Sequence, residues 1–130
     1  MQLQYIYNKE GFLCPAGLAS FQQGDIKIDN LSIIFDTGAS HTFLHPAIAQ
    51  KFNINTYGSV HASSGDIRNC SLTSGTITLF DKSDSISFNK EIVVSESAVD
   101  MLIGMDVLKN SQFVFMPHED KYVFTIIFPD

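Results

Sequence analysis

The chain has 130 residues and a formal net charge of −6, and its lysines and arginines never form a run. This charge balance disfavours nucleic acid and anionic membrane surfaces as partners. No apolar stretch approaches the roughly 20 residues of a membrane-spanning helix. Because 45% of the residues are hydrophobic, a sizeable core can form, and we expect one domain over residues 1–130.

Targeting and redox signals point to the cell interior. The N-terminus is too polar for a signal peptide, so we expect a cytoplasmic protein. Cys14 and Cys70 are the two cysteines, and in that compartment free thiols are favoured over a single disulfide. They lack the spacing of a metal site, so we expect no metal or other cofactor.

Alternating apolar and polar residues in the first third of the chain predict extended segments at residues 3–7, 12–21, 25–29 and 31–35. Pro15 favours an edge position for the second of them. Asp29 and Asn30 are typical turn residues, so they predict a tight hairpin between the third and fourth. We assign residues 16–128 to the core of the domain. Residues 1–15 could form a dimer strand, a self-cleaved leader or a cover over a cleft.

The apolar segment 31–35 leads directly into Asp36, and Thr37-Gly38-Ala39-Ser40 follows. A buried strand that ends abruptly in turn residues places Asp36 where the core meets a loop. A carboxylate there is costly unless it is hydrogen-bonded, paired or exposed in a cleft. Asp-Thr-Gly is also a common strand-ending turn, so the rest of the chain has to decide between a turn and a working acid.

The remaining chain predicts further strands and two short helices. Residues 45–52 suit a helix that begins at Pro46, and a second short helix follows Gly104. Residues 58–70 predict a hairpin with its tip at residues 63–66. Four further strands are expected at residues 72–80, 85–95, 112–116 and 122–128, with turns at 81–84 and 117–120. Eight or nine strands with two short helices indicate a mostly-β domain, closed or sandwich-like.

Two motifs in this order resemble the retropepsin-type aspartic protease family. The first is Asp36-Thr-Gly-Ala-Ser40, and the second is Asp100-Met-Leu-Ile-Gly-Met-Asp-Val-Leu108. The resemblance covers residues 16–116, and the second motif is most similar to the retroviral-like protease domains of cellular proteins. It implies an all-β, closed acid-protease barrel that acts as a homodimer.

The resemblance also implies a role for individual residues. Asp36 would be the catalytic carboxylate, and Thr37 would brace the loop against a second copy. Gly38 would present its backbone to a substrate, Ala39 would form the floor of a pocket, and Ser40 would complete the loop. The remaining candidates are Ile103 and Gly104 beneath the loop, His41 in a substrate pocket, and a flap of Ala62, Ser63, Ser64, Gly65 and Asp66.

Aspartic protease chemistry needs two carboxylates that share a proton, yet the chain holds one Asp-Thr-Gly and no Asp-Ser-Gly. A protease of this kind would therefore be a two-fold homodimer that cleaves extended protein or peptide substrates. The alternative is a retropepsin-fold module for dimerisation or peptide binding, with little or no catalysis. A third possibility is a monomer in which Asp36 only caps a turn.

Other residues suggest weaker hypotheses. His41 and His45 stand four apart, but the adjacent Pro46 argues against one helix that carries both toward a metal. Ser40 lacks the Gly-x-Ser-x-Gly elbow of a hydrolase nucleophile. We expect Asp106 to cap or pair locally near the second helix and Asp100 to face solvent.

Overall fold

The computed structural model describes residues 1–63 and 67–129, and the side chains of all these except 59–63 and 67–69. This part of the chain forms ten strands and two short helices. In chain order they are β1 (Gln2–Asn8), β2 (Ala16–Gln23), β3 (Ile26–Phe35), β4 (Phe43–Leu44), α1 (Pro46–Lys51), β5 (Tyr57–Ser63), β6 (Ile67–Phe80), β7 (Ser85–Val94), β8 (Met101–Ile103), α2 (Met105–Leu108), β9 (Gln112–His118) and β10 (Lys121–Ile127). The predicted mostly-β class with two short helices is confirmed.

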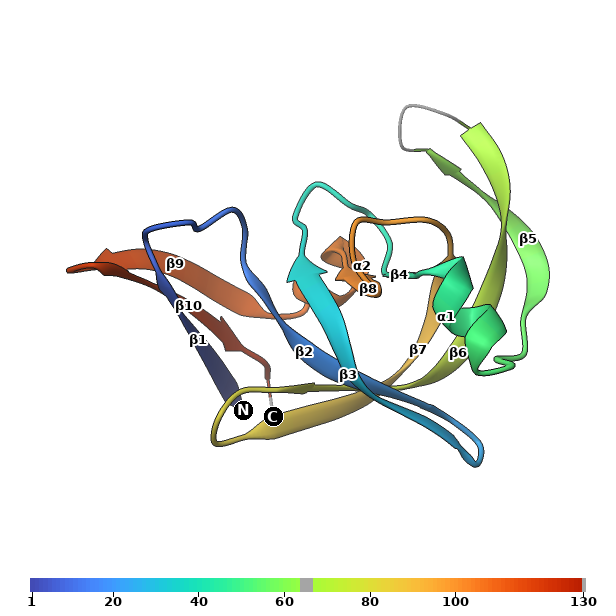
Figure 1. Ribbon diagram of the computed structural model, residues 1–130, viewed down its shortest axis with the longest axis horizontal. Coiled ribbons are helices and arrows are strands. Elements are labelled where there is room, and N and C mark those ends of the chain that lie inside the picture. Colours follow the sequence, from blue (N-terminus) through green and yellow to red (C-terminus); the bar gives the residue numbers. More distant parts are fainter. Residues whose placement is uncertain (64–66, 130) are drawn as a thin grey trace.

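Six strands close into a barrel. Their order is β2-β3-β8-β4-β7-β6, and a second pairing of β2 with β6 joins the two ends. Strand β5 extends the sheet beyond β6, and the β5–β6 hairpin projects from the barrel in Figure 1. The closed barrel expected from the resemblance is therefore confirmed.

The core lies where β3 and β8 cross the barrel. Leu31, Ile33 and Phe35 alternate inward along β3 and are buried, as are all three residues of β8. The two strands pair in parallel, with Phe35 opposite Ile103. The sequences of parallel strands buried in this way are continuous apolar runs, which is why residues 101–103 are all hydrophobic.

The predicted hairpin at Asp29 and Asn30 is wrong. β3 runs without interruption through both residues, and the turn that precedes it lies at Gly24, where φ is 57°. Asn30 also has a positive φ of 58°, but here Asp29 and Asn30 together lie opposite the single residue Ser20. They form a β-bulge, which uses the same left-handed conformation as a turn without reversing the chain.

The predicted extended segment at residues 12–21 begins later than expected. Strand β2 starts at Ala16, and Pro15 lies before it with its carbonyl accepting the backbone N–H of Phe35 (3.0 Å). Proline cannot donate to a strand ladder, but its carbonyl still anchors the end of β3.

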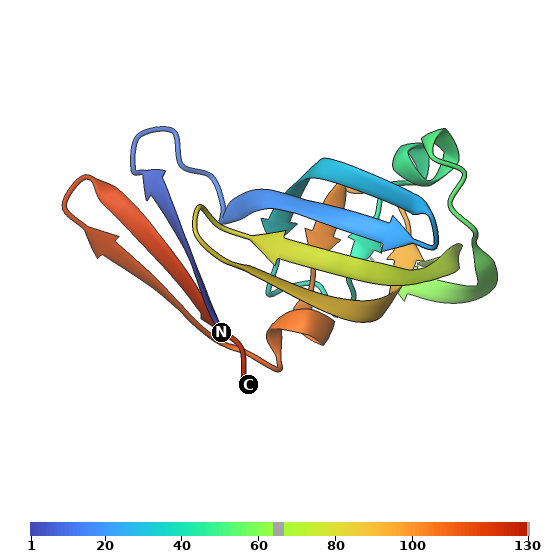
Figure 2. The same ribbon diagram turned by 90° about the horizontal axis from the view of Figure 1, so that it is seen from below.

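A separate three-stranded sheet joins the two ends of the chain. Its order is β1-β10-β9, so the N-terminal strand pairs with β10 of the same chain. Figure 2 shows this sheet beside the barrel, with β9 as its outermost strand. The rings of Tyr5 and Phe124 lie 5.3 and 5.2 Å from the ring of Phe35. The sheet therefore packs beneath the strand end that leads into Asp36.

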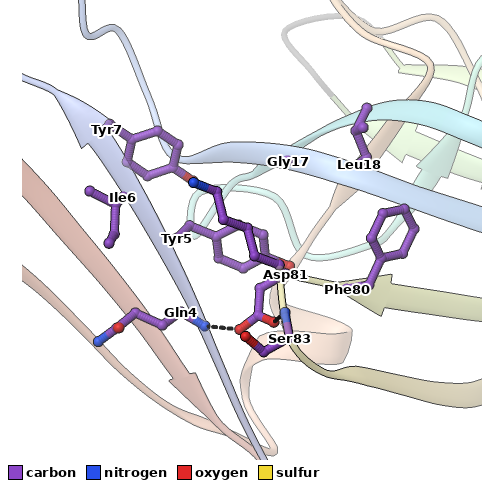
Figure 3. A pocket seen from close by; sticks show the side chains of 10 residues that line it. Gln4, Tyr5, Ile6, Tyr7, Gly17, Leu18, Phe80, Asp81 and Ser83 are labelled. Atoms are coloured by element: carbon purple, nitrogen blue, oxygen red, sulfur yellow. Dashed lines mark hydrogen bonds between the residues drawn. The ribbon is translucent and has the colours of Figure 1, made fainter.

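Strand β1 is fixed to the barrel at two points. The backbone N–H of Gln4 donates to Asp81 Oδ2 (2.8 Å), and the Tyr7 hydroxyl bonds both the N–H (2.9 Å) and the carbonyl of Ala16. A pocket of about 460 Å³ remains between β1 and the barrel, and Figure 3 shows the side chains that line it. Gly17 forms one wall, where a Cβ would come within 2.9 Å of the Tyr5 ring. The pocket is not lined by residues of the Asp36 loop.

Within the described ranges, no helix is long and apolar enough to cross a membrane.

Replacing Tyr7 with phenylalanine should lower the free energy of unfolding at pH 7 by about 1–2 kcal/mol, because Ala16 loses both hydrogen bonds. Burial raises the pKa of Tyr7 to about 12, whereas an unfolded tyrosine titrates near pH 10. Stability from this group is therefore present below about pH 10 and is lost as the pH rises toward 12. The difference between wild type and variant should shrink over that window in urea titrations followed by circular dichroism.

Tyr57→Phe is the matched control, because the Tyr57 hydroxyl donates to Glu91 (2.8 Å) at the surface. We expect a change within about 0.5 kcal/mol. An equal loss in both variants, or a Tyr7→Phe difference that grows above pH 10, would contradict the assignment.

Candidate active site

Asp36 lies at the carboxyl end of two paired parallel strands. Phe35 is opposite Ile103 in the β3–β8 ladder, and the backbone N–H of Asp36 donates to the Ile103 carbonyl (2.9 Å). The first residue of the loop is therefore still fixed by the sheet. Asp36 is half-buried, while Thr37 and Gly38 are exposed, so the carboxylate sits at the boundary between core and solvent.

The loop itself holds the Asp36 side chain in place. The Gly38 N–H donates to Asp36 Oδ1 (2.9 Å), and the Ala39 N–H donates to the Asp36 carbonyl (3.2 Å). A Cβ on Gly38 would lie 3.2 Å from Oδ1, a tight contact for a side chain. The backbone of Gly38 is not left-handed. Its missing side chain instead leaves room beside the carboxylate.

Gly104 allows the second motif to approach the loop closely. A Cβ at this position would lie 2.2 Å from the His41 carbonyl oxygen and 2.9 Å from that of Ala39. The next residue, Met105, donates its N–H to the Ala39 carbonyl (2.7 Å). Ile103 and Gly104 thus lie directly beneath the loop, and no other residue fits position 104 without moving the backbone.

Asp106 fixes the far end of the loop. Its Oδ2 accepts the Thr42 backbone N–H (3.0 Å), and its Oδ1 accepts the Thr42 hydroxyl (2.8 Å) and the Val107 N–H (2.9 Å). Lys90 of β7 lies 3.5 Å from Oδ2. Thr42 is fully buried and accepts the Gly104 N–H through its hydroxyl (3.2 Å). Asp106 therefore does pair at the start of α2, but its main partner lies 64 positions earlier.

Asp100 is not directed to solvent, as we had expected. Its side chain is half-buried and accepts the Ser32 N–H (2.9 Å), and its own N–H donates to the Ser32 hydroxyl (3.3 Å). The Asp100 carbonyl accepts the His45 N–H (2.9 Å). This residue links β3 to the segment that precedes α1.

His41 and His45, which follow the first motif, have different surroundings. His45 caps α1, since its Nδ1 accepts the Ala47 N–H (3.0 Å). His41 is exposed at the rim of the loop beside Ser40. In the described part of the chain, no three His, Cys, Asp or Glu side chains gather as metal ligands.

The hairpin expected at residues 58–70 is formed by β5 and β6. Ala62 pairs with Arg68, and Ser63 pairs with Ile67. The other flap candidates, Ser64, Gly65 and Asp66, lie outside the described residues. In Figure 1 the hairpin and the loop after β3 lie toward the same side of the barrel.

A family model described as gag-polyprotein putative aspartyl protease matches residues 23–110. The match includes both motifs and more than half of the chain. The chain belongs to this family. No curated protein matches it significantly.

Three solved structures align with the chain. A retropepsin-like aspartic protease from Rickettsia conorii aligns with a TM-score of 0.55 and 17% identity, over 96% of this chain and 92% of that one. EIAV protease complexed with the inhibitor HBY-793 gives 0.48 and 21%, over 79% and 90%. The retroviral protease-like domain of Ddi1 from Leishmania major gives 0.44 and 12%, over 91% and 97%. The first of these likenesses supports the retropepsin-like fold.

Replacing Asp106 with alanine should lower the free energy of unfolding by about 2–4 kcal/mol, because the buried Thr42 N–H and hydroxyl lose their acceptor. Thr42→Val removes the hydroxyl that donates to Asp106 Oδ1. The two changes should therefore be clearly non-additive when they are combined in a double-mutant cycle measured by urea unfolding.

Asp29→Ala is the matched control. Asp29 pairs with Lys27 at 3.9 Å, and both side chains are about 60% exposed (62% and 59%). This surface pair should contribute no more than about 0.5 kcal/mol. Additive effects of the Asp106 and Thr42 changes would show that the two residues do not act together.

Proposed function

We propose that this chain is an aspartic endopeptidase whose active site forms between two copies, each of which supplies Asp36. The observation that carries the proposal is the placement of Asp36. It follows a buried strand, its backbone is bonded to β8, and its carboxylate accepts the Gly38 N–H in an otherwise open loop. A turn that merely ends a strand needs no such support from a second, distant motif.

One chain alone lacks the second carboxylate that this chemistry needs. The chain carries one Asp-Thr-Gly, and Thr37 is exposed and makes no hydrogen bond to another described residue. In the dimer, the two Asp36 carboxylates would share one proton, because like charges close together cannot both ionise readily. Thr37 would then brace its own loop against the loop of the partner subunit.

The proposed reaction follows from that shared proton. The ionised carboxylate accepts a proton from a water molecule, whose oxygen attacks the scissile carbonyl carbon. The protonated carboxyl donates to the carbonyl oxygen as the tetrahedral intermediate forms. Proton transfer to the peptide nitrogen then allows the carbon–nitrogen bond to break. No metal or other cofactor is required.

The proposed substrate is an extended polypeptide held between the catalytic loops and the two β5–β6 hairpins by main-chain hydrogen bonds. Gly38 would offer its backbone to the substrate, and Ala39 would floor an apolar pocket. His41 and Ser40, exposed at the loop rim, would face the substrate side chains. The β5–β6 hairpin, in which Ala62 pairs with Arg68 and Ser63 with Ile67, would cover the bound chain.

A cleavage assay on a peptide library, read by mass spectrometry from about pH 4 to pH 7, tests this proposal. Wild type should cut at defined sites, and Asp36→Asn should lower the rate by at least about 10²–10⁴-fold because neither carboxylate remains to activate water. The rate per chain should also rise with protein concentration until the dimer is saturated.

Asp29→Asn, at an exposed position on β3, controls for the loss of one negative charge and should cleave like wild type. If Asp36→Asn retains the activity, the assignment of Asp36 is wrong. If a confirmed dimer of the wild type produces no cut at all, the fold serves dimerisation or peptide binding instead.

A further inference from the structure

We propose that the pocket between β1 and the barrel is a second binding site, and that it takes a small amphipathic amine, an organic ammonium ion with an apolar body. Its lining comes from β1, from β2, from the end of β6 and from the turn that follows. Its volume of about 460 Å³ lies within the range of about 300–1,000 Å³ that is typical of small-molecule sites. No residue of the Asp36 loop lines it, so this site is independent of the proposed protease function.

The hydroxyl of Tyr5 is the feature that indicates a ligand. Tyr5 is 8% exposed and lines the pocket. Within the described part of the chain, its hydroxyl is the one buried side-chain polar atom that has no hydrogen-bond partner. Buried hydroxyls are nearly always paired, because an unpaired one loses its bonds to water and gains none. A ligand that places a polar group at this point would remove that cost.

Neighbouring groups hold the Tyr5 ring in its orientation. The ring lies 5.3 Å from that of Phe35 and 6.5 Å from that of Phe124. At Gly17 of β2, a Cβ would come within 2.9 Å of the same ring. The ring is therefore closely packed, and its hydroxyl cannot swing out to water at low cost. Figure 3 shows the ring extending from β1 toward Asp81.

Asp81 supplies a fixed negative charge to the pocket. Its Oδ2 accepts the Gln4 N–H (2.8 Å), and its Oδ1 accepts the N–H groups of Ser83 (2.8 Å) and Asp84 (2.7 Å). These bonds, first the one from Gln4, lower the pKa of Asp81, so the carboxylate is ionised at neutral pH. An ionised carboxylate offers about four acceptor positions in all, and Oδ2 therefore keeps one for a ligand.

These two groups favour a cation over an anion. Burial raises the pKa of Tyr5, and the nearby Tyr7 and Asp81 raise it further. The hydroxyl therefore stays neutral and keeps its acceptor positions. A carboxylate or phosphate ligand would meet Asp81 as a like charge. An ammonium group has three N–H donors and can donate both to Asp81 Oδ2 and to the Tyr5 oxygen.

An apolar surface for the body of the ligand begins where the pocket begins. Leu18 of β2 lies opposite Phe80 of β6, and both line the pocket. The next pairs on the same face of this ladder are polar, Ser20 with Thr78 and Gln22 with Thr76. Leu18 is 44% exposed although it is a large apolar residue. An aromatic or branched aliphatic group that packs on Leu18 and Phe80 would remove this surface from water.

Lys82 is a competing cation in the same pocket. It lines the pocket from an exposed position in the β6–β7 turn. The Tyr5 hydroxyl is covered, so an entering ligand has to displace a side chain of the lining. The flexible stem of Lys82 makes it the side chain that moves most readily. Because its charge also repels a second ammonium group, removal of that charge should tighten the binding of an amine.

Three molecules that share a phenyl ring test the ligand class at pH 7. They are phenethylamine, neutral phenethyl alcohol and anionic phenylacetate, each titrated into the isotope-labelled chain and followed by two-dimensional amide NMR. The amine should bind with a dissociation constant near about 1 mM, typical of so small a ligand, and at least about tenfold more tightly than the other two. The amide signals of Gln4, Gly17 and Ser83 should shift most, because these residues line the pocket.

Asp81→Asn tests the charged partner. It should weaken phenethylamine binding at least about tenfold, because it removes the charge from the acceptor, and it should leave the binding of phenethyl alcohol unchanged. Asp84→Asn is the matched control. It removes the same charge from the same turn, but Asp84 does not line the pocket. It should bind the amine within about twofold of wild type, since salt screens a distant surface charge.

Tyr5→Phe tests the second partner and does not depend on the fold of the turn. It should weaken phenethylamine binding about threefold or more, because one acceptor is lost. It should not lower the melting temperature of the free chain, because the hydroxyl that it removes has no partner. This is the opposite of the loss expected for Tyr7→Phe. Lys82→Met should tighten the binding of the amine and leave that of the alcohol unchanged.

Several results would overturn the site. Tighter binding of phenylacetate than of the amine, or weaker amine binding in Lys82→Met, would show that the pocket selects an anion. Amine-induced shifts confined to the Asp36 loop, or no shift up to about 10 mM, well above the expected dissociation constant, would show that the amine does not bind here. A loss of stability in Tyr5→Phe as large as that in Tyr7→Phe would show that the Tyr5 hydroxyl is already bonded, by water, and that the pocket is only hydrated.

Discussion

Gly104 lies so close to the loop before it that a single added carbon would overlap the His41 carbonyl. This approach brings the end of β8 beneath the end of β3, and it lets Ile103 bond Asp36 while Met105 bonds Ala39. The Asp36 loop therefore rests on the backbone of residues 103–105 rather than on side chains. Everything else at the site is arranged around that backbone, because it fixes where Asp36 leaves the sheet.

Two kinds of interaction hold the loop from opposite ends. At its far end, the buried Thr42 is bonded by Asp106, which Lys90 of the barrel approaches. At its near end, the aromatic rings of the terminal sheet pack under Phe35. The residues between these supports, Thr37 to His41, stay largely open. A loop held firmly from within and exposed outward fits the proposed site between two chains, in which a second chain would supply the remaining contacts.

Local patterns predicted much of this fold. The helix at α1 follows from Pro46 with a capping side chain before it, and the β5–β6 and β6–β7 hairpins follow from their turn residues. The errors arose where one local signal fits two structures. Asn30 adopts the left-handed conformation that a turn would use, yet it forms a bulge because its neighbours pair on both sides of it. Asp106 resembles a helix-capping acid, and nothing local indicates that Thr42 binds it.

The sequence by itself determined the strand content, the two motifs and the position of Asp36 at the end of a buried strand. These properties depend on residues that are neighbours along the chain, and hydrophobic periodicity and turn chemistry record them directly. Only the tertiary structure decided that Thr42 and Asp106 meet, that Gly104 passes beneath His41, and that β9 is left with an apolar, unpaired edge. Those features depend on how the barrel closes and on which strand becomes the outermost one. Neither can be predicted from the spacing of residues along the chain.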